Sequence, residues 1–284
     1  MGFGSGGGGS SSISGASDAA LNNPQTSQVL TYDTVTAKWK NASLPVSSAQ
    51  PEINTKLGIF KAAVANRDSM SVPIVFAGSS TVAGAGASSG DRQFVRIFTA
   101  LVQAAYPLRT GSHPSFTSLG SATLPLANGI QGIGAGIGGT TSSNFLTSTT
   151  IGQIAALTPR CIVIQVGAND YGSNVNPSTY KTNMTNQLAS LRSAINAPCL
   201  FVLMHQYRRG DTTPNYSWTA YATALNEIAD ASSDAIFVNI EPFFAAAGVP
   251  APDLFNLLGS DNLHSTDAGH AMIADVLKDS FKLV

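Results

Sequence analysis

Residues 73–84 read PIVFAGSSTVAG, an apolar run that stops abruptly at a glycine, two serines and a threonine. An apolar run this short, bounded by a glycine, is typical of a buried strand rather than a helix. The Gly-Ser-Ser sequence predicts a tight turn, which places a hydroxyl group at the carboxyl end of the strand. Because open α/β sheets carry their ligands at that edge, we interpret Ser80 as a candidate nucleophile.

The segment that follows the turn predicts a helix. Residues 91–105 read DRQFVRIFTALVQAA, with apolar side chains at the spacing of one helical face. Two named motifs do not fit this strand, loop and helix. The nucleophile elbow of α/β-hydrolases needs a glycine where this chain has Val82, and a P-loop needs a lysine that is absent near Gly84.

The composition excludes several classes of partner. The 284 residues suit one medium domain with an appendage, and only 11% of them are charged, against about a quarter in typical domains. The net charge is −1 and there is no run of Lys or Arg, so we expect no nucleic-acid or membrane partner. No apolar stretch approaches the roughly 20 residues that span a bilayer, and the first residues do not resemble a secretory signal.

The first 70 residues read as an appendage to the main domain. Residues 1–19 form a Gly/Ser-rich flexible tail, and residues 20–70 predict a β-hairpin, with strands near 28–33 and 37–41, followed by a helix over 52–66. The string VLTYDTVTAKWKNAS at 29–43 resembles a short repeat of bacteriophage tail and virion proteins. That resemblance implies virion assembly or a homo-oligomer, and action outside the host cell.

Strands and helices alternate through the main domain, residues 71–284. Further strands are expected at 129–134, 161–166, 199–204 and 235–240, and further helices at 149–157, 177–195, 217–231 and 267–278. This alternation predicts an α/β protein, a three-layer α/β/α sandwich with a mainly parallel, flavodoxin-like sheet. Cys161 and Cys199 each open an apolar run, and we expect buried free thiols, with a pair across neighbouring strands as the alternative.

Polar residues follow the predicted strands in a pattern that fits acyl transfer. A serine needs a base to take its proton, and the base needs an acid to orient it. Asp261 and His264 lie three residues apart, so that one loop could bring His264 to Ser80 and Asp261 to the other ring nitrogen. The backbone N–H groups of Ser80 and Gly139 and the side-chain amide of Asn169 are candidate donors to an oxyanion.

These residues resemble the SGNH, or GDSL-type, hydrolase family over about residues 72–284. The run from Gly78 to Gly84 resembles the block G-D-S-x-x-x-G, with Ser79 in place of its aspartate, and GAND at 167–170 and DNLH at 261–264 match G-x-N-D and D-x-x-H. The resemblance implies the SGNH fold, Ser80, Asp261 and His264 as the catalytic residues, and no cofactor. It also implies an oxyanion hole of Ser80, Gly139 and Asn169, with Gly136 and Gly138 as alternatives to Gly139.

Each of these residues also has a purely structural interpretation, because serine, asparagine and aspartate commonly cap helices and turns. His205, Tyr207 and Trp218 are candidate substrate-binding residues, with Tyr207 and Trp218 as a platform for a sugar ring and hydrophobic packing as the alternative. No cluster of side chains has the spacing of metal ligands, so we expect no metal.

The family resemblance implies a serine esterase that hydrolyses short-chain acyl esters, such as O-acetyl groups on carbohydrate, in a small-molecule or polysaccharide substrate. A lipase or thioesterase is the alternative among enzymes. A non-catalytic glycan-binding or structural virion module on the same scaffold is the alternative from another class. Turnover that depends on Ser80 separates the enzyme from the binding module.

Overall fold

The computed structural model describes residues 19–20, 28–33, 38–43 and 49–283, which divide into two compact units, residues 1–53 and 54–284. In the first unit β2 (Gln28–Asp33) pairs antiparallel with β3 (Lys38–Ser43), and β1 (Ala19–Ala20) runs parallel to β3. The predicted hairpin is thereby confirmed. The predicted tail lies almost entirely outside the described residues.

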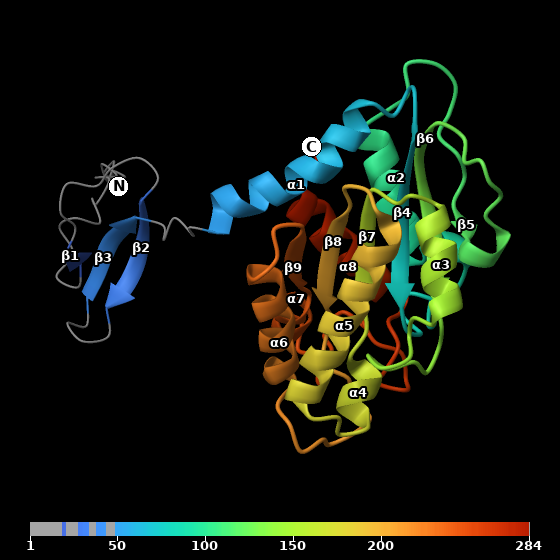
Figure 1. The fold of residues 1–284 in the computed structure, drawn as a ribbon. Coiled ribbons are helices and arrows are strands. Elements are labelled where there is room, and N and C mark those ends of the chain that lie inside the picture. Colours follow the sequence, from blue (N-terminus) through green and yellow to red (C-terminus); the bar gives the residue numbers. More distant parts are fainter. Residues whose placement is uncertain (1–18, 21–27, 34–37, 44–48, 284) are drawn as a thin grey trace, which may run out of the picture. The chain divides into compact units, whose positions relative to one another are not determined.

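The second unit is built on a six-stranded sheet in the order β5-β6-β4-β7-β8-β9, in which every neighbouring pair is parallel (Figure 1). Its strands are β4 (Ser71–Gly78), β5 (Thr117–Ser118), β6 (Gly129–Gly136), β7 (Cys161–Gln165), β8 (Leu200–His205) and β9 (Ala235–Asn239). The central strands are buried on both faces and therefore lack an alternating pattern of polar residues. The predicted parallel α/β sheet is confirmed.

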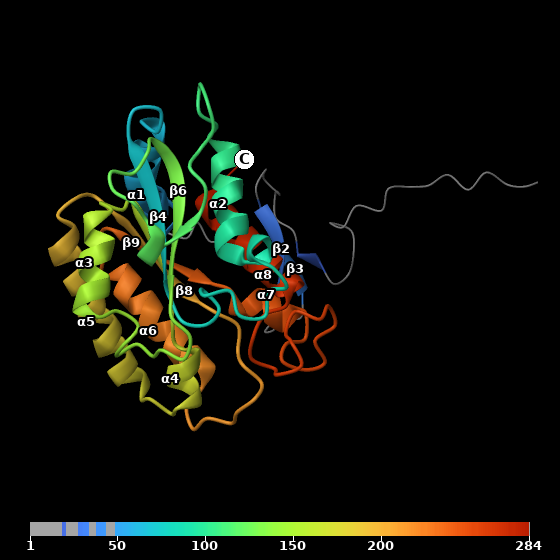
Figure 2. The same ribbon diagram turned by 90° about the vertical axis from the view of Figure 1, so that its right-hand side faces the viewer.

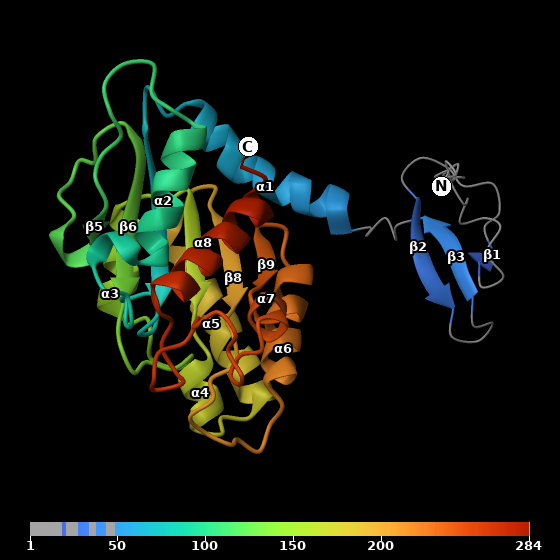
Figure 3. The ribbon, with the colours of Figure 1, turned by 180° about the vertical axis from the view of Figure 1, so that it is seen from behind.

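Helices cover both faces of this sheet. One face is covered by α3 (Ser148–Ala156), α5 (Pro177–Ile195) and α6 (Trp218–Asp230), as Figures 1 and 2 show. The other face is covered by α2 (Phe94–Ala105) and α8 (Asp267–Phe281), which lie in front in Figure 3. The apolar stripe of α2 packs against Phe76 of β4 through the rings of Phe94 and Phe98.

The chain order of the strands places a topological switch at β4. The chain passes from β4 to β6 on one side, and later enters β7 on the other side of β4. The loops that follow β6, β4 and β7 therefore leave the same edge of the sheet next to one another. Crevices of this kind hold the ligands of open α/β sheets.

The helix α1 (Ala49–Ala65) shows that the main unit starts earlier than the sequence predicted. Leu57, Phe60 and Val64 of α1 are buried, and the Phe60 ring meets Phe281 of α8 edge-on at 5.4 Å. The compact unit therefore begins at Asn54, rather than at residue 71. The apolar spacing predicted the helix, but not the partner against which it packs.

Several short elements lie where the sequence predicted neither a helix nor a strand. They are β5, a 3-10 turn at Leu119–Ser121, α4 (Ala168–Gly172) and α7 (Glu241–Ala246). These elements have between two and six residues, and such short segments carry too little apolar periodicity to be detected. In the part of the chain that the structure describes, no helix combines the length and apolar character needed to cross a membrane.

Candidate active site

Ser80, His264 and Asp261 form one hydrogen-bonded chain at the carboxyl edge of the sheet. The Oγ atom of Ser80, just beyond β4, lies 3.0 Å from Nε2 of His264. The Nδ1 atom of His264 lies 2.7 Å from Oδ2 of Asp261 in the loop that precedes α8. Residues 184 positions apart in the sequence thus meet in the order nucleophile, base and acid.

The loop itself fixes the ionisation of Asp261. Partial desolvation acts to raise the pKa of this carboxyl group, but the backbone N–H groups of His264 and Leu263 and the His264 ring donate to it, and its pKa falls below the usual value. An ionised Asp261 can only accept, so Nδ1 of His264 carries the proton. Nε2 is then free to accept the hydroxyl proton of Ser80.

The end of β4 holds the backbone before Ser80 against the neighbouring strand. A Cβ atom at Gly78 would lie 1.9 Å from the carbonyl oxygen of Gln165, so only glycine permits this approach. The N–H of Ser79 donates to the same carbonyl at 3.1 Å, and the Ser79 side chain is buried. Of the two adjacent serines, only Ser80 therefore directs its hydroxyl toward His264.

The α8 helix holds the nucleophile loop, the segment that follows Ser80, at Ala85 and Ser88. Asp267 accepts from the backbone N–H and the hydroxyl of Ser88. The buried His270 accepts from the Phe94 N–H at Nδ1, so its Nε2 donates to the Ala85 carbonyl at 3.1 Å. Through these contacts of His270, α8 supports the nucleophile loop.

The glycine-rich loop after β6 approaches Ser80. A Cβ atom at Gly138 would lie 4.0 Å from Cβ of Ser80, and Gly139 has φ +77°, in the region that favours glycine. Gly136 instead packs against the Ala83 backbone, where a Cβ atom would lie 2.3 Å from the nitrogen. Within the described residues, the N–H groups of Ser80 and Gly139 donate to no protein acceptor, so both are available to a ligand.

Asn169 and Asp170, at the start of α4, tie the loop after β7 to the glycine-rich loop. The Asn169 amide donates one hydrogen to the Thr140 carbonyl at 2.8 Å, which leaves its second hydrogen for another acceptor. Asp170 is buried and accepts from the N–H and the hydroxyl of Ser142, at 2.9 and 2.5 Å. Desolvation raises the pKa of Asp170 against the opposing effect of the Ser142 hydrogen bonds. The pairing of Asp170 with Ser142 was not predicted, because the two residues lie 28 positions apart in the sequence.

The three candidate substrate-binding residues are buried. Trp218 lies over the His205 ring at a centroid distance of 4.2 Å, and Tyr207 stacks on Phe244. The Tyr207 hydroxyl donates to the Leu263 carbonyl at 3.0 Å, inside the loop that carries Asp261 and His264. Burial lowers the pKa of His205 to about 3. Buried rings offer no face to a sugar, and in this structure the three side chains pack within the main unit.

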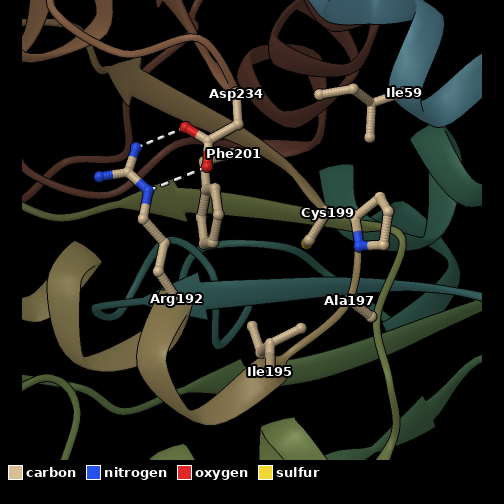
Figure 4. Close-up of a pocket in the computed structure, with 8 residues that line it drawn as sticks. Ile59, Arg192, Ile195, Ala197, Cys199, Phe201 and Asp234 are labelled. Carbon is tan, nitrogen blue, oxygen red and sulfur yellow. Dashed lines mark hydrogen bonds and ion pairs between the residues drawn. The ribbon is translucent and has the colours of Figure 1, made fainter.

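A pocket of about 240 Å³ lies at the opposite, amino edge of the sheet (Figure 4). It is lined by Ile59, Arg192, Ile195, Ala197, Pro198, Cys199, Phe201 and Asp234. Cys161 and Cys199 are both free and buried, and burial raises the pKa of the Cys199 thiol to about 12. No group of His, Cys, Asp and Glu side chains that could hold a metal ion occurs among the described residues.

Solved structures similar to this chain are esterases with low sequence identity. An acetylxylan esterase from Geobacillus stearothermophilus aligns with a TM-score of 0.55 at 17% identity, covering 76% of this chain and 96% of its own. A peptidoglycan O-acetylesterase gives a TM-score of 0.60 at 12% identity, covering 80% and 95%. A two-domain esterase active on acetylated mannans gives 0.56 at 16%, covering 81% of this chain and 56% of its own. At these identities the likeness shows the fold alone.

A comparison with curated protein sequences gave no match. The model of the GDSL-like lipase/acylhydrolase family, however, matches residues 76–272, which include the end of β4, the nucleophile loop and the loop of Asp261 and His264. The chain therefore belongs to the GDSL-like lipase/acylhydrolase family and is an ester-hydrolysing serine hydrolase.

Proposed function

We propose that this protein removes short acyl groups, O-acetyl groups first, from carbohydrate through an acyl-enzyme on Ser80. The observation that carries the proposal is the chain of hydrogen bonds from Ser80 through His264 to Asp261, at 3.0 and 2.7 Å. It lies beside the free N–H groups of Ser80 and Gly139. Acyl transfer needs this combination of nucleophile, base, acid and oxyanion donors.

The first half of the reaction acylates the serine. His264 takes the hydroxyl proton at Nε2 while Oγ of Ser80 bonds to the carbonyl carbon, and the carbonyl electron pair moves to its oxygen. The N–H groups of Ser80 and Gly139 and the second amide hydrogen of Asn169 bind this oxyanion. The bond to the alcohol then breaks, the proton passes from His264 to the leaving oxygen, and the sugar hydroxyl departs.

Water completes the cycle. His264 takes a proton from a water molecule as the water oxygen bonds to the acyl carbon of the ester on Ser80. The tetrahedral intermediate collapses, the bond to Oγ breaks, and the proton on His264 returns to Ser80. Acetic acid leaves and ionises in solution. Asp261 stays ionised throughout, where it holds the Nδ1 proton of His264 and stabilises the imidazolium that forms twice in each cycle.

The substrate class is supported by the names of the solved structures, which describe those proteins as esterases of acetylated xylan, mannan or peptidoglycan. The low content of charged residues, with polarity supplied by Ser, Thr, Asn and Gly, also fits a neutral, hydroxyl-rich ligand. A preference for long acyl chains would favour the lipase alternative instead. Glycan binding without turnover would favour the binding module.

The test measures acetate release from acetylated xylan and mannan oligosaccharides, and hydrolysis of p-nitrophenyl esters from acetate to palmitate. Ser80→Ala is expected to abolish both, while the matched variant Ser79→Ala keeps activity, because the Ser79 side chain is buried and its contact is made by the backbone. A fluorophosphonate should modify Ser80, located by mass spectrometry. Labelling of another residue, or full activity of Ser80→Ala, contradicts the proposal.

The first unit is proposed to attach the enzyme to a virion or to other copies of the chain. This rests on the resemblance of residues 29–43 to phage tail repeats and on the hairpin formed by β2 and β3. Removal of residues 1–45 is expected to leave p-nitrophenyl acetate hydrolysis unchanged, because Ser80, Asp261 and His264 all lie in the second unit. Light scattering of both chains should show a smaller assembly for the truncated one. If both chains form assemblies with the same number of copies, the first unit does not mediate self-association. Co-sedimentation with phage particles tests attachment to a virion, and loss of the full-length chain from the pellet would contradict it.

A further inference from the structure

Residues 206–211, which continue the chain beyond β8, run alongside the loop that carries Asp261 and His264. We call these residues the β8 strap. The N–H of Gly210 donates to the Asn262 carbonyl at 2.7 Å, and the Tyr207 hydroxyl donates to the Leu263 carbonyl at 3.0 Å. Both acceptors lie between the candidate acid and base in the sequence. The strap therefore holds the acid–base loop by two of its carbonyl groups.

The strap also contacts the oxyanion side of the site, through Arg209. Its Nη1 atom donates at 3.0 Å to the carbonyl of Ala168, the residue directly before Asn169. The guanidinium group lies so close to α4 that a Cβ atom at Gly172 would be 2.5 Å from Nη1. Only 12% of the Arg209 side chain is exposed. Arg209 is thus packed against the helix that carries Asn169, rather than extended into solvent.

Asp211 fixes the orientation of Arg209. Its two carboxylate oxygens accept from Nε and Nη2 at 2.6 Å each. A bidentate pair of this kind sets the plane of the guanidinium group as well as its distance. The hydrogen bond from Arg209 also holds the pKa of Asp211 below its usual value, so the pair stays ionised near neutral pH. With Nε and Nη2 held by Asp211, Nη1 is turned toward the Ala168 carbonyl.

We propose that Arg209, oriented by Asp211, is a positioning residue that sets Asn169 against the Asp261–His264 loop. This inference rests on the proposed esterase function. A single short strap bonds to both sides of the site, so a change in Arg209 alters the placement of the oxyanion donor relative to the base. The reacting groups must be placed to within a fraction of an ångström, and a shift of about 1 Å can cost on the order of 100-fold in rate.

The first experiment compares two arginine variants. Arg209→Gln, which loses the guanidinium group, is expected to lower kcat by about 10- to 100-fold with a smaller change in KM. Arg209→Lys keeps the charge but has one donor group, so it should fall between Gln and wild type. The matched control is Arg192→Gln, which breaks a bidentate pair with Asp234 at the opposite edge of the sheet (Figure 4). Its kcat should be unchanged; an equal loss in this control, or wild-type kcat in folded Arg209→Gln, overturns the inference.

The second experiment separates positioning from general loosening of the fold. If Arg209 acts through Asn169, then adding Arg209→Gln to Asn169→Ala should lower kcat much less than it does in the wild-type background. Fully additive losses contradict this route. Circular dichroism and thermal melts of each variant confirm that the enzyme compared is folded.

A third measurement does not depend on turnover. The proton on Nδ1 of His264, bonded to Asp261 at 2.7 Å, should give a low-field proton resonance. Arg209→Gln is expected to shift or broaden this resonance, and Arg192→Gln to leave it in place. If wild-type protein hydrolyses no ester, the proposed function fails, and this resonance still decides the positioning role. An unchanged resonance in Arg209→Gln refutes it.

Discussion

The two edges of the sheet each carry a bidentate arginine–aspartate pair. The two pairs differ in whether the arginine also contacts a segment of the candidate active site. At the amino edge Arg192 binds Asp234 and lies over the Phe201 ring at 5.3 Å, beside the pocket in Figure 4. At the carboxyl edge Arg209 binds Asp211 and has a further donor on the Ala168 carbonyl. Among the described residues, the Arg192 side chain hydrogen-bonds only to its aspartate partner and lies over the Phe201 ring, whereas Arg209 also bonds to α4, the helix that carries Asn169.

The pocket at the amino edge has a defined volume but lacks the groups for catalysis. Its one nucleophile, Cys199, is a neutral thiol, because burial raises its pKa to about 12. The carboxyl edge instead aligns a hydroxyl group, an imidazole ring and a carboxylate within hydrogen-bonding distance. The presence of a cavity is therefore a poor guide to function here. The order in which hydrogen-bond donors and acceptors are connected is a better one.

Among variants that keep Ser80, the largest loss of activity at the carboxyl edge is expected from Asp261→Asn. The amide cannot hold the proton on Nδ1 of His264 as a carboxylate does, so the ring loses the tautomer that leaves Nε2 free to accept. We expect a loss of up to about 10⁴ in kcat with the fold retained. Steady-state kinetics and circular dichroism measure it. A folded Asp261→Asn enzyme with wild-type kcat would remove the carboxylate from the mechanism.

Asn169→Ala is expected to have the next largest effect. It removes the amide hydrogen proposed to bind the oxyanion, which should lower kcat by about 10²- to 10³-fold and change KM far less. Asn169→Asp should do at least as much damage, since it places negative charge beside the oxyanion. The Thr140 carbonyl loses its donor in both variants, so a thermal melt accompanies the kinetics. Near-wild-type kcat in both folded variants would contradict the oxyanion role.

A smaller effect, on stability rather than rate, is expected from the buried His205 at the same edge. Its pKa is about 3 when folded and near 6.5 when unfolded, so only the unfolded chain binds the proton at intermediate pH. The stability it contributes is complete above pH 6.5 and is lost as the pH falls toward 3. At pH 5 the loss is about 2 kcal/mol relative to pH 7.

Urea denaturation of wild type and His205→Gln at pH 7 and pH 5 measures this contribution. Because the substitution also disturbs the packing on Trp218, the relevant quantity is the change in free energy of unfolding between the two pH values. The variant should lose about 2 kcal/mol less than wild type between them. Equal losses would mean that His205 is not the group that takes up the proton.

The smallest effect is expected at the amino edge. Arg192→Gln removes a partly exposed bidentate pair, which should lower the free energy of unfolding by about 1 kcal/mol and leave kcat unchanged. The reason is that the pair contacts no segment of the candidate site. Denaturation curves and steady-state kinetics on the same preparation test both halves. A large fall in kcat would contradict the conclusion that only the pair at the carboxyl edge acts on the candidate site.

The sequence predicted the regular elements because their signals are local. The strand ending at Gly78, the helix at 177–195 and the alternation between them follow from apolar runs and helical spacing. The same patterns carried the family resemblance, since its motifs follow strands that the sequence could locate. The hairpin of β2 and β3 was found for the same reason.

Side-chain exposure was not predictable in this way. Tyr207 and Trp218 have the composition of a sugar platform, but whether an aromatic face meets solvent depends on elements distant in sequence, such as α7 beneath Tyr207. The domain boundary failed for a similar reason. The contacts that attach α1 to the main unit, such as that of Phe60 with Phe281, join residues that lie far apart in the sequence.

By itself, the sequence determined the alternation of strands and helices and the identity of the groups at their ends, because propensity, periodicity and short motifs are local properties of the chain. Tertiary structure alone decided which of those groups meet. The hydrogen bond between Ser80 and His264, the tie of Asp170 to Ser142 and the contact of Arg209 with Ala168 join residues 184, 28 and 41 positions apart. No local rule contains such pairs, because they form only when the packing of the whole sheet fixes the relative positions of its loops.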